Sequence, residues 1–521
     1  MARVTERLAT SGLLQLYRPD QVARLLLAVV RYGFTPALGP TAGKVLYPGA
    51  KALVDDDGTL TFVELDRLCD AAGLRLRAAG LRPGVRVGLL ARNSRGFYAA
   101  MVGAARAGLD VVYLNTGSTA PQLAEIGRSE GISALVYEAE FADRIPPDMS
   151  GHDVAELMAV PLPDGRPDAG GRRSQHVILT SGTTGRPRGV ARASAGIDAA
   201  LAMVAGFPHR IRRAHVVAAP MFHAWGWGNL LLAMAYCSTV VVTRRFDPER
   251  VLALVERERC EVLVAVPVML QRLVDLDPAV TDRYDTSRLK VAAVSGSALS
   301  GELASAFMDR YGDILYNLYG STEAAFATIA EPDDLRAAPG TAGRPLPGVR
   351  AEVVDADGRP VPQGHVGEIV VTSRTAFSGY TSRENANQPA NVRDGGAHRV
   401  RLGDLGRFDR RGRLFVVGRA DDMVVTGGEN VYPVTVEHAF EGHPDVLEAA
   451  AVGVADQEFG QAVVVHLRLR DDVGRPPSAD DLRTWSKARL APHEVPRRVV
   501  LHTEPLPRNE TGKVVKSRLS G

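Results

Sequence analysis

Short apolar runs that alternate with helical stretches are the feature that most constrains the fold of this chain. Between residues 86 and 137 the runs RVGLLA, DVVYLN and ALVY are separated by helical stretches near 97–107 and 121–130. The same rhythm returns between residues 215 and 300 with HVVAAP, STVVVT, VLVAVP and KVAAVSGSALS. Strands and helices that alternate in this way pack as a mainly parallel sheet with helices on its faces. The sequence therefore predicts an α/β protein.

The pattern changes twice towards the C-terminus. Residues 351–371 have a pattern typical of β-strands, and Asp357-Gly358 predicts a hairpin turn within them. After Arg419 the chain changes to a small α+β pattern. We therefore expect a domain boundary here, with one domain at 1–419 and a second at 420–521.

The composition is that of an ordinary globular protein and argues against one class of partner. Of the 521 residues, 45% are apolar and 23% are charged, which is typical of a globular protein. The net charge is only +2 and the arginines are spread along the chain, so we do not expect nucleic acid as a partner. Cys69, Cys237 and Cys260 lie far apart and in no metal-like spacing, which suits a reducing cytoplasm.

Two segments are apolar enough to raise the question of a membrane. Residues 216–243 carry no charge, but Pro220, His223 and several glycines and tryptophans interrupt them, so we interpret the segment as strand, loop, buried helix and strand. The run QVARLLLAVVRYGF (21–34) is amphipathic. We expect it to pack on the core, and a weak contact with a membrane surface is the alternative. No secretory signal peptide is recognisable.

The stretch ILTSGTTGRPRGV (178–190) suggests a site for an anion. An apolar strand is followed by glycines that permit close backbone approach, by the hydroxyl pair Thr183 and Thr184, and by Arg186 and Arg188. Successive backbone N–H groups in such a loop can cradle phosphate. A Gly/Ser surface turn would explain the same composition without any ligand. The usual P-loop signature is missing, which argues against a kinase or a GTPase.

Five segments in a fixed order carry a resemblance to a known family. They are TSGTTGRPRGV (180–190), PMFHAWGW (220–227), NLYGSTE (317–323), GDLGRFDRRGRLFVVGRADDMV (403–424) and PRNETGKV (507–514). With them the chain resembles the acyl-adenylate-forming superfamily of acyl-CoA synthetases, adenylation domains and luciferases, from about residue 51 to 518. Within this superfamily, the residues of its motifs are most similar to those of the bacterial fatty-acyl-CoA synthetases.

The resemblance implies both a fold and an activity. The expected fold is a large N-terminal part of two α/β subdomains plus a small β-barrel-like region, followed by a mobile α+β C-terminal domain. The expected activity uses ATP and Mg²⁺ to turn a carboxylic acid into an acyl-adenylate and pyrophosphate, after which CoA captures the acyl group as a thioester. Domain rotation would separate the two half-reactions.

The resemblance also assigns roles to individual residues. It implies that Lys513, Thr322 and Glu323 are catalytic, that Thr184 and Glu323 approach the metal, that Asp421 is the hinge and that Gly428 lies at the CoA channel. The residues assigned to ATP or AMP are Thr180, Ser181, Gly182, Thr183, Thr184, Gly185, Arg188, Gly296, Ser297, Ala298, Asn317, Tyr319, Gly320, Ser321, Asp404 and Arg419. The residues assigned to the acyl pocket are His223, Trp225, Gly226, Val266, Ser295, Gly320, Ala324 and Ala325. Because so many of these are small, we expect a roomy apolar pocket for a medium-to-long chain or a bulky polycyclic acid.

Several alternatives stay open at this point. Arg188 replaces the usual lysine, Leu402 replaces a usual threonine or serine, and residues 389–400 lack the common aromatic side chain, so the two half-reactions could be unequally efficient. The acceptor could be a carrier-protein pantetheine or an amine instead of free CoA. The chain could also be a nucleotide-binding scaffold without turnover. A homodimer is a further partner that we leave open.

Overall fold

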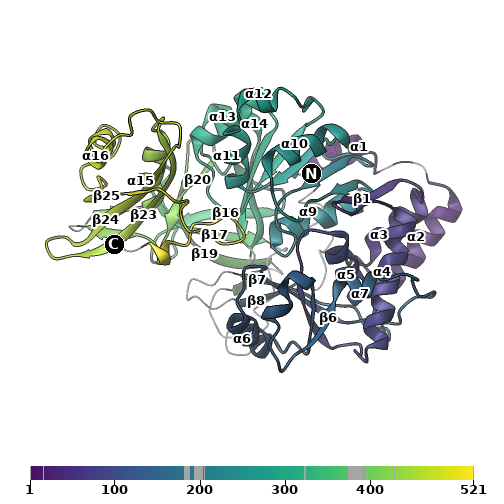
Figure 1. Cartoon of the computed structure of the whole chain (residues 1–521). Helices are drawn as coiled ribbons and strands as arrows, with labels where there is room; N and C mark the ends of the chain where they lie inside the picture. Colours follow the sequence, from purple (N-terminus) through teal and green to yellow (C-terminus); the bar gives the residue numbers. More distant parts are fainter. Residues whose placement is uncertain are drawn as a thin grey trace.

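The computed structural model describes most of the chain. The described residues are 2–13, 15, 17–180, 188–192, 204, 206–321, 324–373, 391–394, 397–426 and 429–519. Figure 1 shows a large part in which helices cover two sheets, and a smaller part that contains the last strands and helices of the chain. This mixture of sheets and helices confirms the predicted α/β fold class.

A six-stranded sheet contains the two strands on either side of the candidate phosphate loop. Its strand order is β6-β5-β3-β4-β7-β8, and all neighbours are parallel except β7 and β8. The strands are β3 (Arg86–Leu90), β4 (Asp110–Tyr113), β5 (Ala134–Tyr137), β6 (Ser150–Asp153), β7 (His176–Thr180) and β8 (Arg188–Arg192). The helices between the first strands are α5 (Arg95–Arg106) and α6 (Ala120–Glu130), and the short helices η1 (Ala139–Arg144) and α7 (Val154–Met158) follow. The predicted alternation of strand and helix is confirmed here.

A nine-stranded sheet forms the centre of the large part. Its order is β15-β14-β13-β12-β11-β9-β10-β1-β2, and the run from β13 to β1 is parallel throughout. The strands are β1 (Lys51–Asp55), β2 (Gly58–Thr61), β9 (Ala214–Val217), β10 (Thr239–Val241), β11 (Val262–Ala265), β12 (Val291–Val294), β13 (Leu315–Ser321), β14 (Ala325–Ala330) and β15 (Arg344–Pro345). Parallel neighbours place their carboxyl ends at one edge, so the loops that follow these strands lie close together.

Helices pack around these two sheets. They are α1 (Ala2–Ser11), α2 (Pro19–Tyr32), α3 (Leu38–Leu46), α4 (Phe62–Ala78), α9 (Ala224–Ala235), α10 (Pro248–Arg257), α11 (Pro267–Val274), α12 (Pro278–Thr281), α13 (Gly301–Tyr311) and α14 (Pro332–Ala337). Strand β9, helix α9 and strand β10 confirm our interpretation of residues 216–243. Within the described residues, no helix is both long and apolar enough to cross a membrane.

Two smaller sheets complete the fold. The first contains β16 (Val349–Val354), β17 (Gly367–Ser373), β18 (Asn391–Asp394), β19 (Ala397–Phe408) and β20 (Leu414–Arg419). The second contains β21 (Val424–Thr426), β22 (Glu429–Val431), β23 (Val446–Asp456), β24 (Gly460–Leu469) and β25 (Arg498–His502). Helices α15 (Pro433–Glu441) and α16 (Ala479–Lys487) and the short η3 (Lys516–Arg518) accompany the second sheet. Its strands lie at one end of the molecule in Figure 1.

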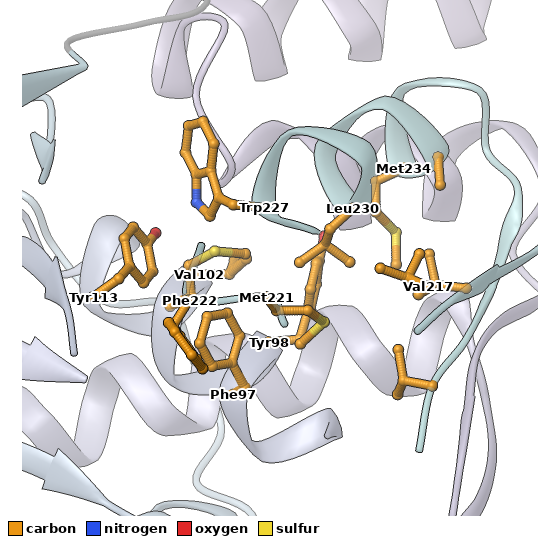
Figure 2. Packing of buried hydrophobic residues seen from close by; sticks show 14 of the residues in the cluster. Phe97, Tyr98, Val102, Tyr113, Val217, Met221, Phe222, Trp227, Leu230 and Met234 are labelled. Carbon is orange, nitrogen blue, oxygen red and sulfur yellow. The ribbon is translucent and has the colours of Figure 1, made fainter. Parts of the chain in front are cut away.

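One large apolar cluster joins the first two sheets. Figure 2 shows Phe97 and Tyr98 of α5 facing Met221, Phe222 and other side chains from the segment around α9. All of these side chains are buried. The two α/β sheets therefore share a core, which holds the loops at their strand ends in fixed relative positions.

Candidate active site

The candidate site lies at the carboxyl edge of the nine-stranded sheet. His223 follows β9, Val266 follows β11, Gly296 follows β12, and Tyr319 lies near the end of β13. These four strands are parallel neighbours in the order β13-β12-β11-β9. The topology therefore brings together residues that the sequence analysis had assigned to ATP and to the acid. Open α/β sheets commonly bind ligands at this edge.

Asp404 of the five-stranded sheet accepts two side-chain hydrogen bonds, one of them from Tyr319 at this edge. The hydroxyl of Tyr319 donates to its Oδ2 at 2.6 Å, and Nη1 of Arg419 donates to its Oδ1 at 3.2 Å. The same guanidinium donates to the carbonyl of Leu402 at 3.0 Å and, through Nε, to Oδ1 of Asp421 at 3.0 Å. Arg419 thus links the expected ribose acceptor to the expected hinge. Leu402 itself is buried, and its backbone supplies an acceptor.

Asp404 retains the capacity to accept further hydrogen bonds. Burial raises the pKa of Asp404 above its ordinary value, while the Tyr319 hydroxyl and the Arg419 guanidinium favour its charged form. Each carboxylate oxygen has two acceptor positions, so one position on each oxygen remains after the contacts to Tyr319 and Arg419. That arrangement suits a pair of neighbouring hydroxyl groups. Burial and the nearby carboxylate raise the pKa of Tyr319, which keeps it a hydroxyl donor.

The loop after β12 is shaped to expose backbone. Gly296 has a φ of +99°, a conformation that favours glycine, and the Cβ of another residue there would lie 3.5 Å from Cγ1 of Val266. Ser297 and Ala298 are exposed, as expected for one wall of a nucleotide site. The side chain of Asn317 is buried and donates instead to the carbonyl of Thr341 at 3.3 Å. Its structural role is to support the strand end.

His223 caps helix α9 and is neutral. Its Nδ1 accepts from the backbone N–H of Trp225 at 3.5 Å. Burial, and then the positive charge of Lys513, lower the pKa of His223 to about 4. A lowered pKa favours the uncharged imidazole near pH 7, which is compatible with an orienting role.

The segment 507–514 forms a tight turn that Asn509 holds together. Oδ1 of Asn509 accepts hydrogen bonds from the backbone N–H groups of Thr511 and Lys513, at 3.1 and 2.9 Å. Arg508 donates to the carbonyl of Gly512 at 2.7 Å and pairs with Glu448 of β23 at 2.9 Å. We had not singled out Asn509, although an asparagine before a glycine-containing turn is a recognised signal for such side-chain capping.

This turn is inserted against the large part of the protein. Gly512 has a φ of +83°, and a Cβ there would lie only 2.5 Å from Cγ1 of Val268 in α11. Glu510 approaches Arg92, with 3.9 Å between Oε2 and Nη1. Lys513 is close enough to lower the pKa of His223 and to favour the charged form of Asp404. Lys513 therefore lies on the same side of the molecule as both His223 and Asp404.

A second contact joins the C-terminal part to the same helix. Nη1 of Arg470, which follows β24, lies 2.9 Å from Oδ1 of Asp275 at the end of α11. Together with the contacts of Glu510 and Gly512, this ion pair fixes the orientation in which Lys513 faces the strand edge. Sequence reasoning missed Arg92, Asp275 and Arg470, because each finds its partner far away along the chain.

The hairpin β7–β8 supports the ends of the phosphate loop. Thr180 pairs with Arg188 in antiparallel register, and the N–H of Gly189 donates to Oε1 of Glu130 at 3.1 Å. Glu130 is buried and also pairs with Arg86 at 3.3 Å. The start of β8 is therefore held by Glu130, a residue that the sequence analysis did not select.

Three of the expected pocket residues have other structural roles. We predicted that Gly226 widens the acyl pocket, but a Cβ there would lie 2.2 Å from the carbonyl oxygen of Pro220, so the glycine is explained by close backbone packing. Ala324 is buried in the core beneath the five-stranded sheet. Trp225 is also buried and donates to the carbonyl of Ala265 at 2.9 Å. Val266 and Ser295 are buried at the strand edge itself.

Several expected residues lie outside the part of the chain that the structure describes. They are Ser181, Gly182, Thr183, Thr184, Gly185, Thr322, Glu323 and Gly428; for Thr180, Arg188 and Ala325 the backbone alone is described. Gly320 and Ser321 complete β13 and are partly exposed. Across the described ranges, no group of three or more histidine, cysteine, aspartate or glutamate side chains could hold a metal ion. The expected ligands Thr184 and Glu323 are not among those ranges.

Comparison with known proteins gives a consistent result. The sequence profile of a family described as "AMP-binding enzyme" matches residues 44–381, and that of the "AMP-binding enzyme C-terminal domain" matches residues 435–513. A feruloyl-CoA synthase from an Amycolatopsis species is 33% identical, over 91% of this chain and 96% of its own length. A fatty acid–[acyl-carrier-protein] ligase, ScoC, from Streptomyces coeruleorubidus is 30% identical, over 91% of this chain and 93% of its own length.

A solved structure shares the whole architecture. The o-succinylbenzoate CoA synthetase of Bacillus subtilis, determined with its acyl-adenylate intermediate, superposes with a TM-score of 0.81. It is 26% identical and covers 93% of this chain and 98% of its own. The same enzyme has been solved with ATP and a magnesium ion. With its ordered motifs, its strand-edge site and a profile match over more than half of its length, the chain belongs to the AMP-binding, acyl-adenylate-forming enzymes.

Proposed function

We propose that this protein is an AMP-forming acid–CoA ligase. It would use ATP to convert a carboxylic acid into an acyl-adenylate and then transfer the acyl group to CoA. The observation that carries the proposal is the position of the turn around Lys513, where Gly512 lies against Val268 of α11 and Glu510 approaches Arg92, with the lysine close enough to influence Asp404 and His223. A lysine between a nucleotide site and an acid site can act on the bond that joins the two substrates. Two relatives are named as CoA synthases or synthetases, which supports CoA as the acceptor of the acyl group.

The adenosine end of ATP would be held by Asp404, Tyr319 and the loop after β12. Asp404 has one acceptor position left on each oxygen for the two ribose hydroxyls. The ring of Tyr319 and the exposed backbone of Gly296 to Ala298 would enclose the adenine. These contacts are the same in the ground state and the transition state, so they bind ATP without selecting the reacting geometry.

Lys513 would act on the reaction itself. An oxygen of the substrate carboxylate attacks the α-phosphorus, the bond from that phosphorus to the bridging oxygen breaks, and pyrophosphate leaves. Negative charge increases around the α-phosphate during this step, and a fixed ammonium group beside it stabilises the transition state. The clamp by Asn509 holds the backbone of the lysine in place, which reduces the reorganisation that the step requires.

The phosphate end of ATP would be held by residues 181–187, which include Thr184, and by Glu323. Mg²⁺ neutralises phosphate charge when it is bound, and a hydroxyl, a carboxylate and phosphate oxygens form a normal ligand set for it. The hairpin β7–β8 and Glu130 fix both ends of this loop. Arg188 would supply a cation at this loop.

The second half-reaction would need a different orientation of the C-terminal part. The thiol sulfur of CoA attacks the acyl carbon, the bond from that carbon to AMP breaks, and the thiol proton passes to solvent. We propose domains at 1–419 and 420–521, with Asp421 as the hinge and Gly428 beside the thiol channel. In the orientation described here Asp421 is tied to Arg419, so rotation would have to break that ion pair.

We infer that the acid is apolar and larger than acetate. The relatives are named for feruloyl, fatty and succinylbenzoate groups, which are all larger than acetate and carry an aromatic ring or an alkyl chain. The neutral His223 at the expected acid site is compatible with an apolar neighbour. A carrier-protein thiol is the second candidate acceptor, and it is favoured by the 30% identity to a fatty acid–[acyl-carrier-protein] ligase.

The decisive experiment compares the two half-reactions in matched lysine variants. Pyrophosphate release and acyl-CoA formation are measured with ATP, CoA and a panel of aromatic, fatty and polycyclic acids. Lys513→Ala should reduce acid-dependent pyrophosphate release at least a hundredfold, as expected for loss of a charge contact at the transition state. Lys516→Ala is the matched control, because Lys516 lies in the same segment but pairs with Glu437 at 2.8 Å.

The possible results distinguish between the candidate functions. Pyrophosphate without acyl-CoA, together with acylation of an added carrier protein, would select the carrier thiol as acceptor. Failure of every acid to release pyrophosphate would support a scaffold without turnover. Equal activity of Lys513→Ala and Lys516→Ala would refute the role assigned to Lys513.

A further inference from the structure

Helix α2 has an apolar surface on two faces. One face carries Ala28 and Tyr32, which are buried against Ala37 and Ala105. The ring of Tyr32 also lies beneath the guanidinium of Arg106, 5.2 Å from its carbon to the ring centroid. This face confirms the expectation that the helix packs on the core. It accounts for only part of the apolar surface of the helix.

The second face is exposed. Val22, Leu26, Leu27 and Val30 of α2, and Phe34 just beyond it, are between 41% and 77% exposed. Residues 22, 26 and 30 are four positions apart, and 27 and 34 lie beside them, so the five side chains form one stripe along the helix. We call these five residues the α2 stripe. Figure 1 shows α2 at the rim of the molecule, at the opposite end from α15 and α16.

Basic side chains flank the α2 stripe. The side chains of Arg18 and Arg24 are 73% and 68% exposed, and Arg31 is exposed at the other end of the helix. Arg18 and Arg24 share one carboxylate, Asp20, at 2.8 and 3.9 Å. Three arginines against one aspartate leave the region positively charged. A helix with an apolar stripe bordered by arginines has the chemistry of an interfacial membrane-binding helix.

We propose that the α2 stripe docks this protein on an anionic lipid surface. The five apolar side chains would enter the boundary between headgroups and acyl chains. Arg18, Arg24 and Arg31 would contact lipid phosphates, since the bilayer surface that they approach carries the opposite charge. The helix would lie parallel to the membrane, because its opposite face stays attached to α5 through Tyr32 and Ala28.

A second copy of the chain fits this surface less well. A helix of 14 residues is about 21 Å long, so a stripe about 10 Å wide covers about 200 Å². Stable protein interfaces bury about 800 Å² on each partner. A two-fold contact along α2 would also bring the arginines of both copies together. Area and charge therefore both favour lipid over a homodimer at this face.

The test is flotation of the purified full-length protein with lipid vesicles. One set contains phosphatidylcholine with about 30% phosphatidylglycerol, and the other contains phosphatidylcholine alone. Wild-type protein should float with the anionic set and remain largely unbound with the neutral set. Leu27→Glu combined with Val30→Glu should reduce the bound fraction at least tenfold, since it removes two apolar anchors and adds negative charge. Leu501→Glu is the matched control, because Leu501 is an exposed apolar residue of β25.

A second variant tests the electrostatic part separately. Arg24→Glu with Arg31→Glu should weaken anionic binding severalfold and make the remaining binding less sensitive to salt. ATP-dependent pyrophosphate release with a water-soluble acid should stay the same in both double variants, which checks that they are folded. Wild-type protein that fails to float with the anionic vesicles would overturn the proposal. So would sedimentation showing a wild-type dimer that Leu27→Glu dissociates, because the stripe would then be a protein interface.

Discussion

The hydroxyl of Tyr319 and the carboxylate of Asp404 are joined by a hydrogen bond of 2.6 Å across 85 positions of the chain. Tyr319 belongs to the nine-stranded sheet and Asp404 to the five-stranded sheet. The expected ribose site is therefore assembled only when these two sheets pack together. Any change that separates them should weaken nucleotide binding without touching the nucleotide.

Tyr319→Phe should weaken ATP binding and change its pH dependence. The variant keeps the ring but removes a donor to Asp404, so KM for ATP should rise about three- to tenfold with little change in kcat. Burial already raises the pKa of Asp404, and loss of this hydrogen bond should raise it further. Because ribose hydroxyls need the ionised carboxylate, the fall of kcat/KM for ATP on acidification should begin at a higher pH in the variant.

The matched control for this measurement is Tyr311→Phe. The hydroxyl of Tyr311 donates to the carbonyl of Leu273 at 3.0 Å, away from Asp404. Its kcat/KM profile should overlay that of the wild type. An unshifted acidic limb in Tyr319→Phe would show that Asp404 is not the group that titrates.

Gly512→Ala should inhibit adenylation selectively. The new Cβ would meet Val268 at 2.5 Å in the orientation described here, and φ is also unfavourable at +83°. Acid-dependent pyrophosphate release should fall by one to two orders of magnitude. The conversion of preformed acyl-adenylate to acyl-CoA should fall far less, because the proposed rotation would withdraw the turn before that step.

Two further variants distinguish the two causes of this effect, which are the backbone strain and the clash with Val268. Gly460→Ala introduces the same strain at φ +76° in a place with no atom within 4 Å, so it reports the backbone cost alone. Gly512→Ala combined with Val268→Ala removes the clash and should recover part of the adenylation rate. If Gly460→Ala lowered adenylation as much as Gly512→Ala, the close approach to α11 would not explain the effect.

Breaking the ion pair between Arg470 and Asp275 should shift the balance between the half-reactions. The pair is partly exposed, so its contribution is at most about 1 kcal/mol. Arg470→Asp should lower adenylation about two- to fivefold and leave the thioester step unchanged or faster. Adding Asp275→Arg should restore the wild-type ratio. Arg468→Asp is the control, since Arg468 pairs within the C-terminal part with Asp471 at 3.3 Å.

His176 should make the protein less stable as the pH falls. It is buried, accepts from or donates to the Tyr113 hydroxyl at 2.6 Å, and burial lowers its pKa to about 4. Between its ordinary pKa, about 6.5, and pH 4 the unfolded chain binds more protons, so stability decreases with acidification. At pH 5 this one residue should cost about 2 kcal/mol relative to pH 7.

Denaturant titrations at pH 7 and pH 5 test this expectation. His176→Gln should lose about 2 kcal/mol less than the wild type over this interval, because its side chain does not titrate. His365→Gln replaces an exposed histidine and should behave as the wild type does. A His176→Gln protein with the full wild-type loss would place the acid sensitivity elsewhere.

Local patterns in the sequence were enough to predict the strand ends. The charge-free segment 216–243 was interpreted correctly because proline and glycine interrupt it, and the runs around β3, β4 and β11 were recognised from their apolar texture. Turn chemistry could also have revealed Asn509, whose side chain caps the next residues of its own loop. All of these signals lie within a few residues of the structure that they predict.

Long-range packing was beyond such reasoning. Gly226 was predicted to open a pocket, but the structure packs it against Pro220, and a glycine alone does not say which neighbour excludes its side chain. Glu130, which accepts from Gly189 of β8, and Asp275, which pairs with Arg470, show no special pattern in the sequence. Their roles depend on how separate elements meet in three dimensions.

The continuity of the last sheet, β21 to β25, along the chain has a consequence for how the gene can change. All of its strands come from one uninterrupted stretch of chain, entered once between Arg419 and Val424. Such a block can be exchanged by recombination at a single crossover. A hybrid made there would inherit the lysine turn and its Asn509 clamp from one parent and the strand edge from the other. Evolution could therefore vary acid choice in the larger part of the gene while reusing an unaltered segment for the proposed catalytic lysine in the smaller part.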